Sequence, residues 1–526
     1  MTKKGNNTKR GSVLIAGGGI GGMQAALDLA DSGFKVHMIQ KDPSIGGTMS
    51  MLDKTFPTGD CSMCMISPKM VEVGRHPNIV LHTLSEVTGV EGEPGDFTVT
   101  VHEQPRYVDA EKCTGCGACE KKCPKLVVSE FEQGLSKRKA IYVQYAQAVP
   151  LKYAIDADQC IYLVRGKCKA CEKFCPTGAI NFEDQKKDIT LNVGAVVLTA
   201  GSRTFDPATY DTYGYSKSPN IVTSLEFERI LSASGPYSGH LVRPSDKSEP
   251  EKIAWLQCVG SRDSNQCGNS YCSSVCCMYA IKDSMIAKEH SEEELDCVVF
   301  NMDIRTFGKD YEKYYNRAKD AGIRFVKSKV HSIDDVRETG NLNVRYMDDA
   351  GQLQEEDFDM VVLSVGLQVP ESTVQLAERL GVELDDSRFA VTHPFAPVET
   401  SRPGVYACGA FQEPKDIPSS VTEASAAACA AGASLNSARN TQTRSVEVPE
   451  EIDVSDEDAR VGVFVCNCGI NISSVVDVKG VTEYAKTLPN VVHAQENLFT
   501  CSQDSLVQMK EVIKEHKLNR VVVAAC

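Results

Sequence analysis

Eight of the 22 cysteines fall into two short runs in the first half of the chain. The first run, CTGCGACEKKCP, has the spacing CxxCxxCxxxCP, and the second run ends with the same cysteine–proline pair. Thiolates at this spacing hold three corners of a [4Fe–4S] cubane, while the cysteine before proline ligates the neighbouring cluster. We therefore predict two [4Fe–4S] clusters with crossed ligand sets, Cys113, Cys116, Cys119 and Cys175 for one, and Cys160, Cys168, Cys171 and Cys123 for the other.

The second run departs from the usual pattern, because the residues IYLVRGK separate Cys160 from Cys168. It nevertheless keeps three ligands of its own and takes a fourth from the first run. Zinc is the alternative occupant, and zinc sites are usually built from pairs of CxxC. The repeated cysteine–proline endings favour iron–sulfur clusters.

Two further groups of cysteines could hold clusters. One group lies at the end of an expected strand and the start of a helix, and its alternative role is that of small buried apolar side chains. Cys267 lies near it without an assigned role. The other group belongs to the last 66 residues, where each cysteine lies at or just beyond an expected strand end. The predicted ligands are Cys258, Cys272, Cys276 and Cys277 for the first group, and Cys466, Cys468, Cys501 and Cys526 for the second.

A glycine-rich turn near the N-terminus predicts a dinucleotide site. Gly17, Gly19 and Gly22 form GxGxxG between a strand and a helix, where they allow a tight turn, close approach of a pyrophosphate, and packing of helix on strand. The helix N-terminus then presents N–H groups to the phosphates. A turn used only for packing is the alternative. The acid that usually follows the second strand is replaced by Gln40, which can still hydrogen-bond a ribose.

Later segments favour FAD over NAD at this site. The glycine pair at 46–47 follows the second strand. Gly409 lies between a later strand and a helix, and there Gly409-Ala410 replaces the usual Gly-Asp. The second GxGxxG expected for a nicotinamide is reduced to Gly260, so direct use of NADH or NADPH is a weaker hypothesis. The remaining cofactor-binding candidates are Lys41, Gly47, Thr48, Val87, Ala200 and Gly201.

Three residues are candidates for chemistry next to the flavin. Cys61 and Cys64 lie in DCSMC on the expected flavin side of the fold. A redox-active pair is one interpretation, and a structural role or a role beside a cluster is the other. Lys69, in SPKM, is a candidate for tuning the charge at the flavin ring.

These residues are positioned by alternating strands and helices. Strands are expected at 13–16, 35–40, 194–200, 253–258, 298–302 and 360–365, with helices such as 23–32 and 275–290 between them. Such alternation predicts an α/β doubly wound fold. The chemistry and the elements together predict a flavoprotein like thioredoxin or glutathione reductase, with two dinucleotide-binding domains, an inserted ferredoxin domain and a small C-terminal α/β cluster-binding unit.

The expected boundaries follow from these motifs. The FAD-binding domain is expected in three parts, at 11–101, 187–250 and 371–437, interrupted by the ferredoxin domain at 102–186 and a degenerate NAD-type domain at 251–370. An acidic linker follows at 438–460, and the cysteine-rich unit occupies 461–526. The chain ends directly after the strand VVVAAC, with no helix to cover that strand, which suggests that this unit continues beyond Cys526.

Composition limits the function classes. A formal net charge of −15 and a pI near 5.3 argue against nucleic acid as a partner. The first ten residues are followed by a strand and glycines rather than the apolar segment of a secretory signal, and no apolar run approaches the ~18 residues of a membrane span. We expect a cytoplasmic protein in which cysteines hold metal.

With these motifs assembled, the chain resembles, over residues 11–437, the family formed by the A subunit of heterodisulfide reductase. The resemblance rests on SIGGTMSMLDKTFPTGDCSMCMISPKMVEV, on the double ferredoxin motif, and on LQCVGSRD with YCSSVCCMYAIK. It implies an FAD and iron–sulfur oxidoreductase subunit, with a third cluster at Cys258, Cys272, Cys276 and Cys277. The CNCG segment resembles the family's N-terminal domain but here follows the flavin domain, and the family's C-terminal ferredoxin is absent.

The resemblance also implies partners and two hypotheses for function. The leading one is a subunit that moves electrons between a partner donor, FAD and the clusters, with flavin-based bifurcation to ferredoxin and a disulfide as one mode of action. The other is a non-catalytic conduit in a quinone-interacting or benzoyl-CoA-reducing complex. Expected partners are proteins like the B and C subunits of heterodisulfide reductase, a delta-like subunit of a hydrogenase or dehydrogenase, and ferredoxin, in a hetero-oligomer that contains one or two copies of this chain.

Overall fold

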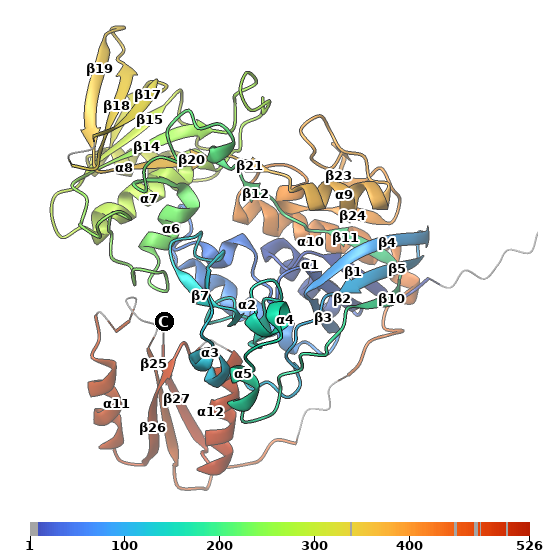
Figure 1. Ribbon diagram of the computed structural model, residues 1–526. Helices are drawn as coiled ribbons and strands as arrows, with labels where there is room; N and C mark the ends of the chain where they lie inside the picture. The colour runs from blue at the N-terminus through green and yellow to red at the C-terminus, as the bar shows by residue number, and fades with distance from the viewer. Residues whose placement is uncertain are drawn as a thin grey trace, which may run out of the picture.

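The computed structural model describes residues 9–336, 339–445, 450–467, 472–473, 475–500 and 503–525. The chain forms two α/β units, a cysteine-rich insert that lies in the middle of the view, and a small terminal unit below it (Figure 1). Within the described residues, no helix is both long and apolar enough to cross a membrane.

The first unit contains a seven-stranded sheet whose central strands are parallel. Strand β1 has the sequence SVLIA and is buried along its whole length, as expected for a parallel strand covered on both faces. The sheet order is β22 (Thr392–His393), β23 (Ala396–Thr400), β24 (Val405–Ala407), β11 (Ala195–Leu198), β1 (Ser12–Ala16), β2 (Lys35–Gln40) and β3 (Ile79–Thr83).

Helices and a small antiparallel sheet cover the two faces of this sheet. Apolar side chains of α1 pack with those of α10 in one core cluster, and Ser425 of α10 donates to Asp28 of α1 at 2.6 Å. The second core cluster lies between the sheet, α9 and the small sheet. The elements are α1 (Ile20–Asp31), α2 (Ser62–Arg75), α9 (Glu371–Leu380), α10 (Ile417–Ser434), β4 (Ser85–Glu93), β5 (Asp96–Glu103) and β10 (Lys187–Val193), with the short turns η1 (Thr48–Met51), η2 (Pro207–Thr209), η3 (Gly409–Phe411) and η4 (Asn436–Ala438).

The second unit is a parallel five-stranded sheet flanked by helices and an antiparallel three-stranded sheet. Its order is β13 (Ile221–Thr223), β20 (Met360–Val365), β14 (Lys252–Val259), β15 (Asp296–Asn301) and β16 (Arg324–Lys327). The remaining elements are α6 (Ser224–Leu231), α7 (Cys276–His290), α8 (Tyr311–Asp320), β17 (Ser332–Val336), β18 (Asn341–Met347) and β19 (Leu353–Phe358), and the two-stranded pair β12 (Arg203–Thr204) and β21 (Leu367–Gln368) joins the units.

One pairing lies across an expected domain boundary. Strand β13 at 221–223 pairs with β20, although the sequence pattern placed the start of the second unit at 251. The three-residue strand is too short to show a periodic pattern, and its capping box from Thr223 to Glu226 only marks the start of α6.

The insert leaves the first unit after β5 and returns through β10, which are paired antiparallel. Its regular elements are short, as expected for a chain that folds around its cysteines. They are α3 (Ala118–Lys122), α4 (Ile161–Arg165), α5 (Ala170–Lys173), β6 (Leu126–Val128), β7 (Lys137–Lys139), β8 (Ile141–Tyr142) and β9 (Ala154–Ile155).

The terminal unit is a parallel three-stranded sheet in the order β26, β25, β27. The described residues between 439 and 460, which lead into it, form no helix or strand. Its elements are β25 (Val461–Asn467), α11 (Val478–Lys486), β26 (Val491–Leu498), α12 (Gln503–Glu515) and β27 (Arg520–Ala524).

Candidate functional site

The glycine turn between β1 and α1 has the shape of a phosphate cradle. Gly17 has a φ of 122°, and a Cβ on Gly22 would lie 1.9 Å from the carbonyl oxygen of Gly17. A Cβ on Gly19 would meet no atom within 4 Å, and no side chain caps the N-terminus of α1. The turn is therefore closed on its protein side and open on the other, and the free N–H groups of the helix face that opening, as a dinucleotide pyrophosphate requires.

The other cofactor-binding candidates follow the carboxyl ends of adjacent parallel strands. Ala200 and Gly201 follow β11, Gly409 follows β24, and Gly47 with Thr48 lies in the loop after β2. A Cβ on Gly47 would lie 2.9 Å from the Cα of Gly19, so this loop closes on the glycine turn. Ala410 is half-buried beside Gly409. The carboxyl edge of an open parallel sheet is where α/β proteins bind ligands.

The end of β2 shows a contact that the sequence pattern did not reveal. Gln40 is buried, and its side chain accepts from the backbone N–H of Gly18 at 2.7 Å and donates to Asp42 at 2.7 Å. Gln40 therefore fixes the glycine turn and orients the carboxylate of Asp42. Asp42 lies two residues beyond the position of the usual acid, which is Gln40 itself. Lys41 is exposed and pairs with Glu86 at 3.1 Å, whereas Val87 is buried in the core.

A second contact of this kind lies at Gly409. The backbone N–H of Gly409 donates to Glu423 of α10 at 3.1 Å, and the same carboxylate pairs with Lys415. Only 5% of the Lys415 side chain is exposed. The ion pair thus fixes the turn before α10, and the irregular segment between β24 and α10 gave no sequence signal for it.

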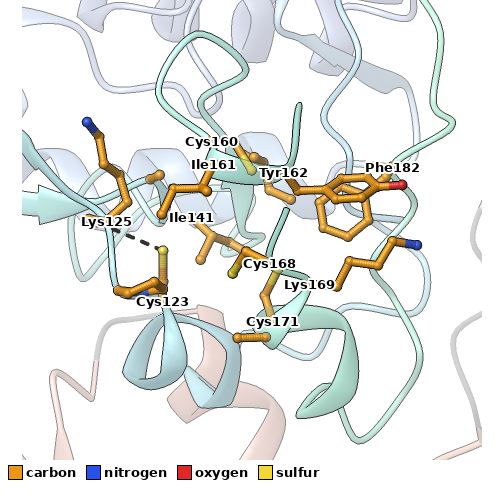
Figure 2. A pocket seen from close by; sticks show the side chains of 14 residues that line it. Cys123, Lys125, Ile141, Cys160, Ile161, Tyr162, Cys168, Lys169, Cys171 and Phe182 are labelled. Carbon is orange, nitrogen blue, oxygen red and sulfur yellow. Dashed lines mark hydrogen bonds between the residues drawn. The ribbon is translucent and has the colours of Figure 1, made fainter. Parts of the chain in front are cut away.

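The structure gathers the eight ferredoxin-type cysteines around two cavities. Cys123, Cys160, Cys168 and Cys171 line one cavity, and Figure 2 shows these side chains facing a common space. The other cavity is lined by the remaining four, Cys113, Cys116, Cys119 and Cys175. Each cavity thus receives three cysteines from one run and one from the other, which is the crossed grouping that the spacing predicts. Their ligation of clusters stays a prediction.

Within the described residues, no three His, Cys, Asp or Glu side chains converge on a point as they would around a single ion. A cubane takes one thiolate at each of its four irons, so its ligands surround a larger body. Four free thiols around each hollow are a donor set that suits such a cluster.

A segment of the insert joins one cysteine cavity to the loop at 44–47, which is called the cofactor loop because it holds a predicted cofactor-binding residue. Val149 pairs with Ile45, and the hydroxyl of Tyr145 donates to the carbonyl oxygen of Ile45. A few residues further on, Lys152 donates to the carbonyl oxygen of Cys113, and Tyr153 lines the cavity of that cysteine. The segment 144–153 therefore connects the loop at 44–47 directly to the cavity around Cys113.

The third cysteine group also comes together. Cys258 is the last but one residue of β14 and has a positive φ of 63°, and Cys276 and Cys277 begin α7. Burial raises the pKa of Cys276, and the proximity of Cys277, Cys258 and Cys272 raises it further. Cys267 donates instead to the carbonyl oxygen of Asp263.

The surviving glycine of the second fingerprint faces protein rather than open space. A Cβ on Gly260 would lie 2.1 Å from the ring of Phe205. Phe205 therefore packs directly against Gly260.

Comparison with known proteins places the chain in a family. A family model described as pyridine nucleotide-disulphide oxidoreductase matches residues 11–428. The iron–sulfur A subunit of the CoB–CoM heterodisulfide reductase of Methanocaldococcus jannaschii is 47% identical over 80% of this chain and 63% of that protein. The A subunit of the H2:CoB–CoM heterodisulfide,ferredoxin reductase of Methanothermobacter marburgensis is 42% identical over 86% of this chain and 67% of that protein. The chain belongs to the family of heterodisulfide reductase A subunits.

The chain spans about two thirds of the length of these relatives. Among solved structures, the thioredoxin reductase of T. acidophilum matches with a TM-score of 0.45 and 15% identity, over 81% of this chain and 97% of that chain. Membership supports a flavin oxidoreductase with iron–sulfur centres, as the sequence predicted.

In this family member, Cys61 and Cys64 form a disulfide at the N-terminus of α2. The disulfide lines a cavity of about 200 Å³, which Cys466 and Thr500 of the terminal unit also line. Cys468, Cys501 and Cys526, the other predicted ligands of that unit, lie outside the described residues. Lys69 donates to Gln24 of α1 at 2.6 Å.

A buried charge cluster lies at the junction of the two α/β units and was not expected from the sequence. Lys282 of α7 forms ion pairs with Glu228 of α6 and with Asp283, and the backbone N–H of Asp53 donates to Glu228 at 2.9 Å. Burial, together with Glu228, raises the pKa of Asp53 to about 6, and burial holds the pKa of Asp283 well above its usual range. No periodic pattern marks this cluster, because its members come from separate segments of the chain.

Proposed function

We propose that this chain is the FAD and iron–sulfur subunit of a heterodisulfide-reductase-like complex. Electrons would move between a partner donor, one FAD and [4Fe–4S] clusters. The observation that carries the proposal is the crossed arrangement of eight cysteines around two cavities, one of which is connected by residues 144–153 to the cofactor loop.

The residues that would hold FAD lie at the carboxyl edge of the seven-stranded sheet. The turn from Gly17 to Gly22 would cradle the pyrophosphate, and the buried side chain of Gln40 would keep that turn in place through Gly18. Thr48, Ala200, Gly201 and Gly409 would line the rest of the cofactor. When bound, FAD would supply the exchange of electron pairs for single electrons.

Those of the proposed cluster ligands that the structure describes are free thiols. Two [4Fe–4S] clusters would occupy the cavities around Cys113 and Cys160, and each would carry one electron. A third would be held by Cys258, Cys272, Cys276 and Cys277. The terminal set of Cys466, Cys468, Cys501 and Cys526 is the proposed site of a fourth, and Cys61, Cys64 and Lys69 remain candidates for chemistry beside the flavin.

The proposed partners follow from family membership. Proteins like the B and C subunits of heterodisulfide reductase, a hydrogenase or dehydrogenase component and ferredoxin would donate and accept electrons in the cytoplasm. Because the second glycine fingerprint is reduced to Gly260, we propose that electrons enter through a partner protein rather than through NADH or NADPH. Bifurcation at the flavin would send one electron to ferredoxin and the other to a disulfide.

The experiment is to purify the chain without oxygen and to measure iron, acid-labile sulfide and flavin. We expect one FAD and roughly twelve irons if the three described groups are filled, and roughly sixteen if the terminal set is filled as well. Roughly eight irons would restrict the clusters to the insert. Fewer than about four irons or the absence of flavin would contradict the proposal, and so would bleaching of the flavin by NADH alone.

A further inference from the structure

The seven residues that separate Cys160 from Cys168 form a small surface element. They contain helix α4, which begins after Cys160 and ends at Gly166 in the left-handed conformation, with a φ of 68°. No residue of α4 is buried, and 57% of Val164 is exposed. Tyr162 and Leu163 pack partly against the core of the insert, whereas Val164 and Arg165 are exposed. The helix thus presents an outer face to solvent directly between two predicted ligands of one cluster.

The cavity around Cys160 opens to the surface beside this helix. Cys160 and Cys171 are buried, whereas Cys168, which follows α4, is exposed. Cys168 and Lys169 both have positive φ, at 91° and 123°, in the loop that closes the cavity. Figure 2 shows Cys168 and Lys169 side by side at its rim.

The surface around this opening is basic in an acidic protein. Between 116 and 126 and between 160 and 178 there are seven lysines and arginines but only two acidic residues, Glu120 and Glu172, whereas the whole chain has a net charge of −15. One ion pair, between Lys169 and Glu172 at 3.4 Å, joins the two signs. The basic residues of this patch are Lys121, Lys122, Lys125, Arg165, Lys167, Lys169 and Lys173.

Apolar side chains lie among these charges. Phe174 is 52% exposed, and the Lys122 ammonium nitrogen lies over its ring, 4.9 Å from the ring centroid. Tyr162 lies under Lys169 at 4.7 Å and packs on Phe182. Encounter complexes of redox proteins use small interfaces and depend on complementary charge, and exposed apolar residues within a ring of one charge fit that type of contact.

We propose that α4 and its basic surroundings form the docking surface for a small acidic one-electron carrier protein, which exchanges electrons with the cluster held around Cys160. The inference rests on the proposed function. The route has a direction in the fold, because residues 144–153 connect the cofactor loop to the cavity of Cys113 and the cavity of Cys160 lies beside α4. One electron leaves the reduced cluster and reduces the oxidised carrier. No bond is made or broken and no proton moves.

The first test measures binding to the holoprotein, purified without oxygen, by titration calorimetry. The probe is a small acidic ferredoxin with two [4Fe–4S] clusters, at 50 and 300 mM NaCl. The double variant R165E/K167E is expected to bind at least about tenfold more weakly at low salt, because it removes the charge attraction between the two proteins. It should also lose most of the salt dependence of binding, since salt weakens binding by screening that attraction. The matched control K309E/R379E reverses two exposed charges outside the insert, one in the turn before α8 and one in α9, and is expected to bind as the wild type does.

The second test separates docking from cluster integrity. Protein reduced with stoichiometric dithionite is mixed with the ferredoxin or with methyl viologen in a stopped-flow instrument. R165E/K167E should slow reduction of the ferredoxin by about tenfold or more while iron content and viologen reduction stay unchanged. The neutral variant R165A/K167A should give an intermediate effect. The substitution V164S should weaken binding without changing its salt dependence.

Three results would overturn the docking proposal. They are unchanged binding in R165E/K167E, an equal loss in the control, and slower viologen reduction or loss of iron, which would make α4 a shield of the cluster. Failure of the proposed function gives a different signature. The wild type would then lack iron at the insert, whereas salt-dependent binding of ferredoxin could still be lost in R165E/K167E.

Discussion

Asp53 lies buried at the junction of the two α/β units, and its ionisation at neutral pH lowers the free energy of unfolding. Its pKa is raised from 3.8 to about 6 by burial and by Glu228, although Lys282 and other cations act in the opposite direction. The folded state therefore holds a proton more tightly than the unfolded state. Well below pH 3.8, Asp53 is protonated in both states and does not lower the free energy of unfolding. The cost grows as the pH rises and is complete above the folded pKa.

The magnitude follows from the shift. One pKa unit is worth about 1.4 kcal/mol, so a rise of this size costs about 3 kcal/mol at pH 7.5 and about 1.5 kcal/mol at pH 5. Asp53→Asn keeps the shape of the protonated acid and cannot ionise. We expect this variant to exceed the wild type in the free energy of unfolding by these amounts at the two pH values.

The assay uses the single tryptophan of the chain. Trp255 is fully buried in the core of the second unit, in edge contact with Phe227, so its fluorescence reports unfolding of that unit in urea. Asp386→Asn, at an exposed aspartate, is the matched control and should leave the midpoint unchanged. Equal stability of Asp53→Asn and wild type at pH 7.5, or a difference that does not grow with pH, would refute the reasoning.

Three further variants test other parts of the structure. Lys282→Met leaves buried carboxylates without their cation. It should therefore lower the free energy of unfolding by about 3–5 kcal/mol at pH 7.5 in the same urea assay. A loss below about 1 kcal/mol would contradict a buried ion pair. Cys171→Ser should remove up to about four irons per chain, whereas Cys267→Ser should remove none, as measured by iron analysis. Gly22→Ala would place a methyl group 1.9 Å from a carbonyl oxygen and should abolish flavin retention, whereas Gly21→Ala, with no atom closer than 3.8 Å, should retain it; equal flavin content in the two variants would disprove the cradle.

Much of the fold could be predicted because strong local patterns specify it. The buried strand SVLIA and the glycines after it locate β1 and α1, and the strands at 35–40 and 360–365 coincide with β2 and β20. The grouping of the ferredoxin-type cysteines also follows from spacing alone, because short loops leave a thiolate few positions.

Contacts between distant elements could not be predicted. The hydrogen bond between Gln40 and Gly18, the ion pair at Glu423 and the cluster around Lys282 each join residues from separate segments, and no period in the sequence relates them. Strand β13 was missed for the same reason, because three residues gain their strand conformation only from pairing with β20. The disulfide of Cys61 and Cys64 could be suspected from spacing, but its place beside the terminal unit depends on the tertiary structure.

The connection between the insert and the cofactor loop has a consequence for assembly. Val149 and Tyr145 form part of the wall of the loop at Ile45, so the loop is complete only when residues 144–153 are in place. Those residues belong to a segment whose few short strands and helices surround the thiols, and metal sites of this kind fold together with their metal. If the proposed clusters occupy the insert, iron and sulfide would enter first, and the flavin would follow once the loop at Ile45 is complete.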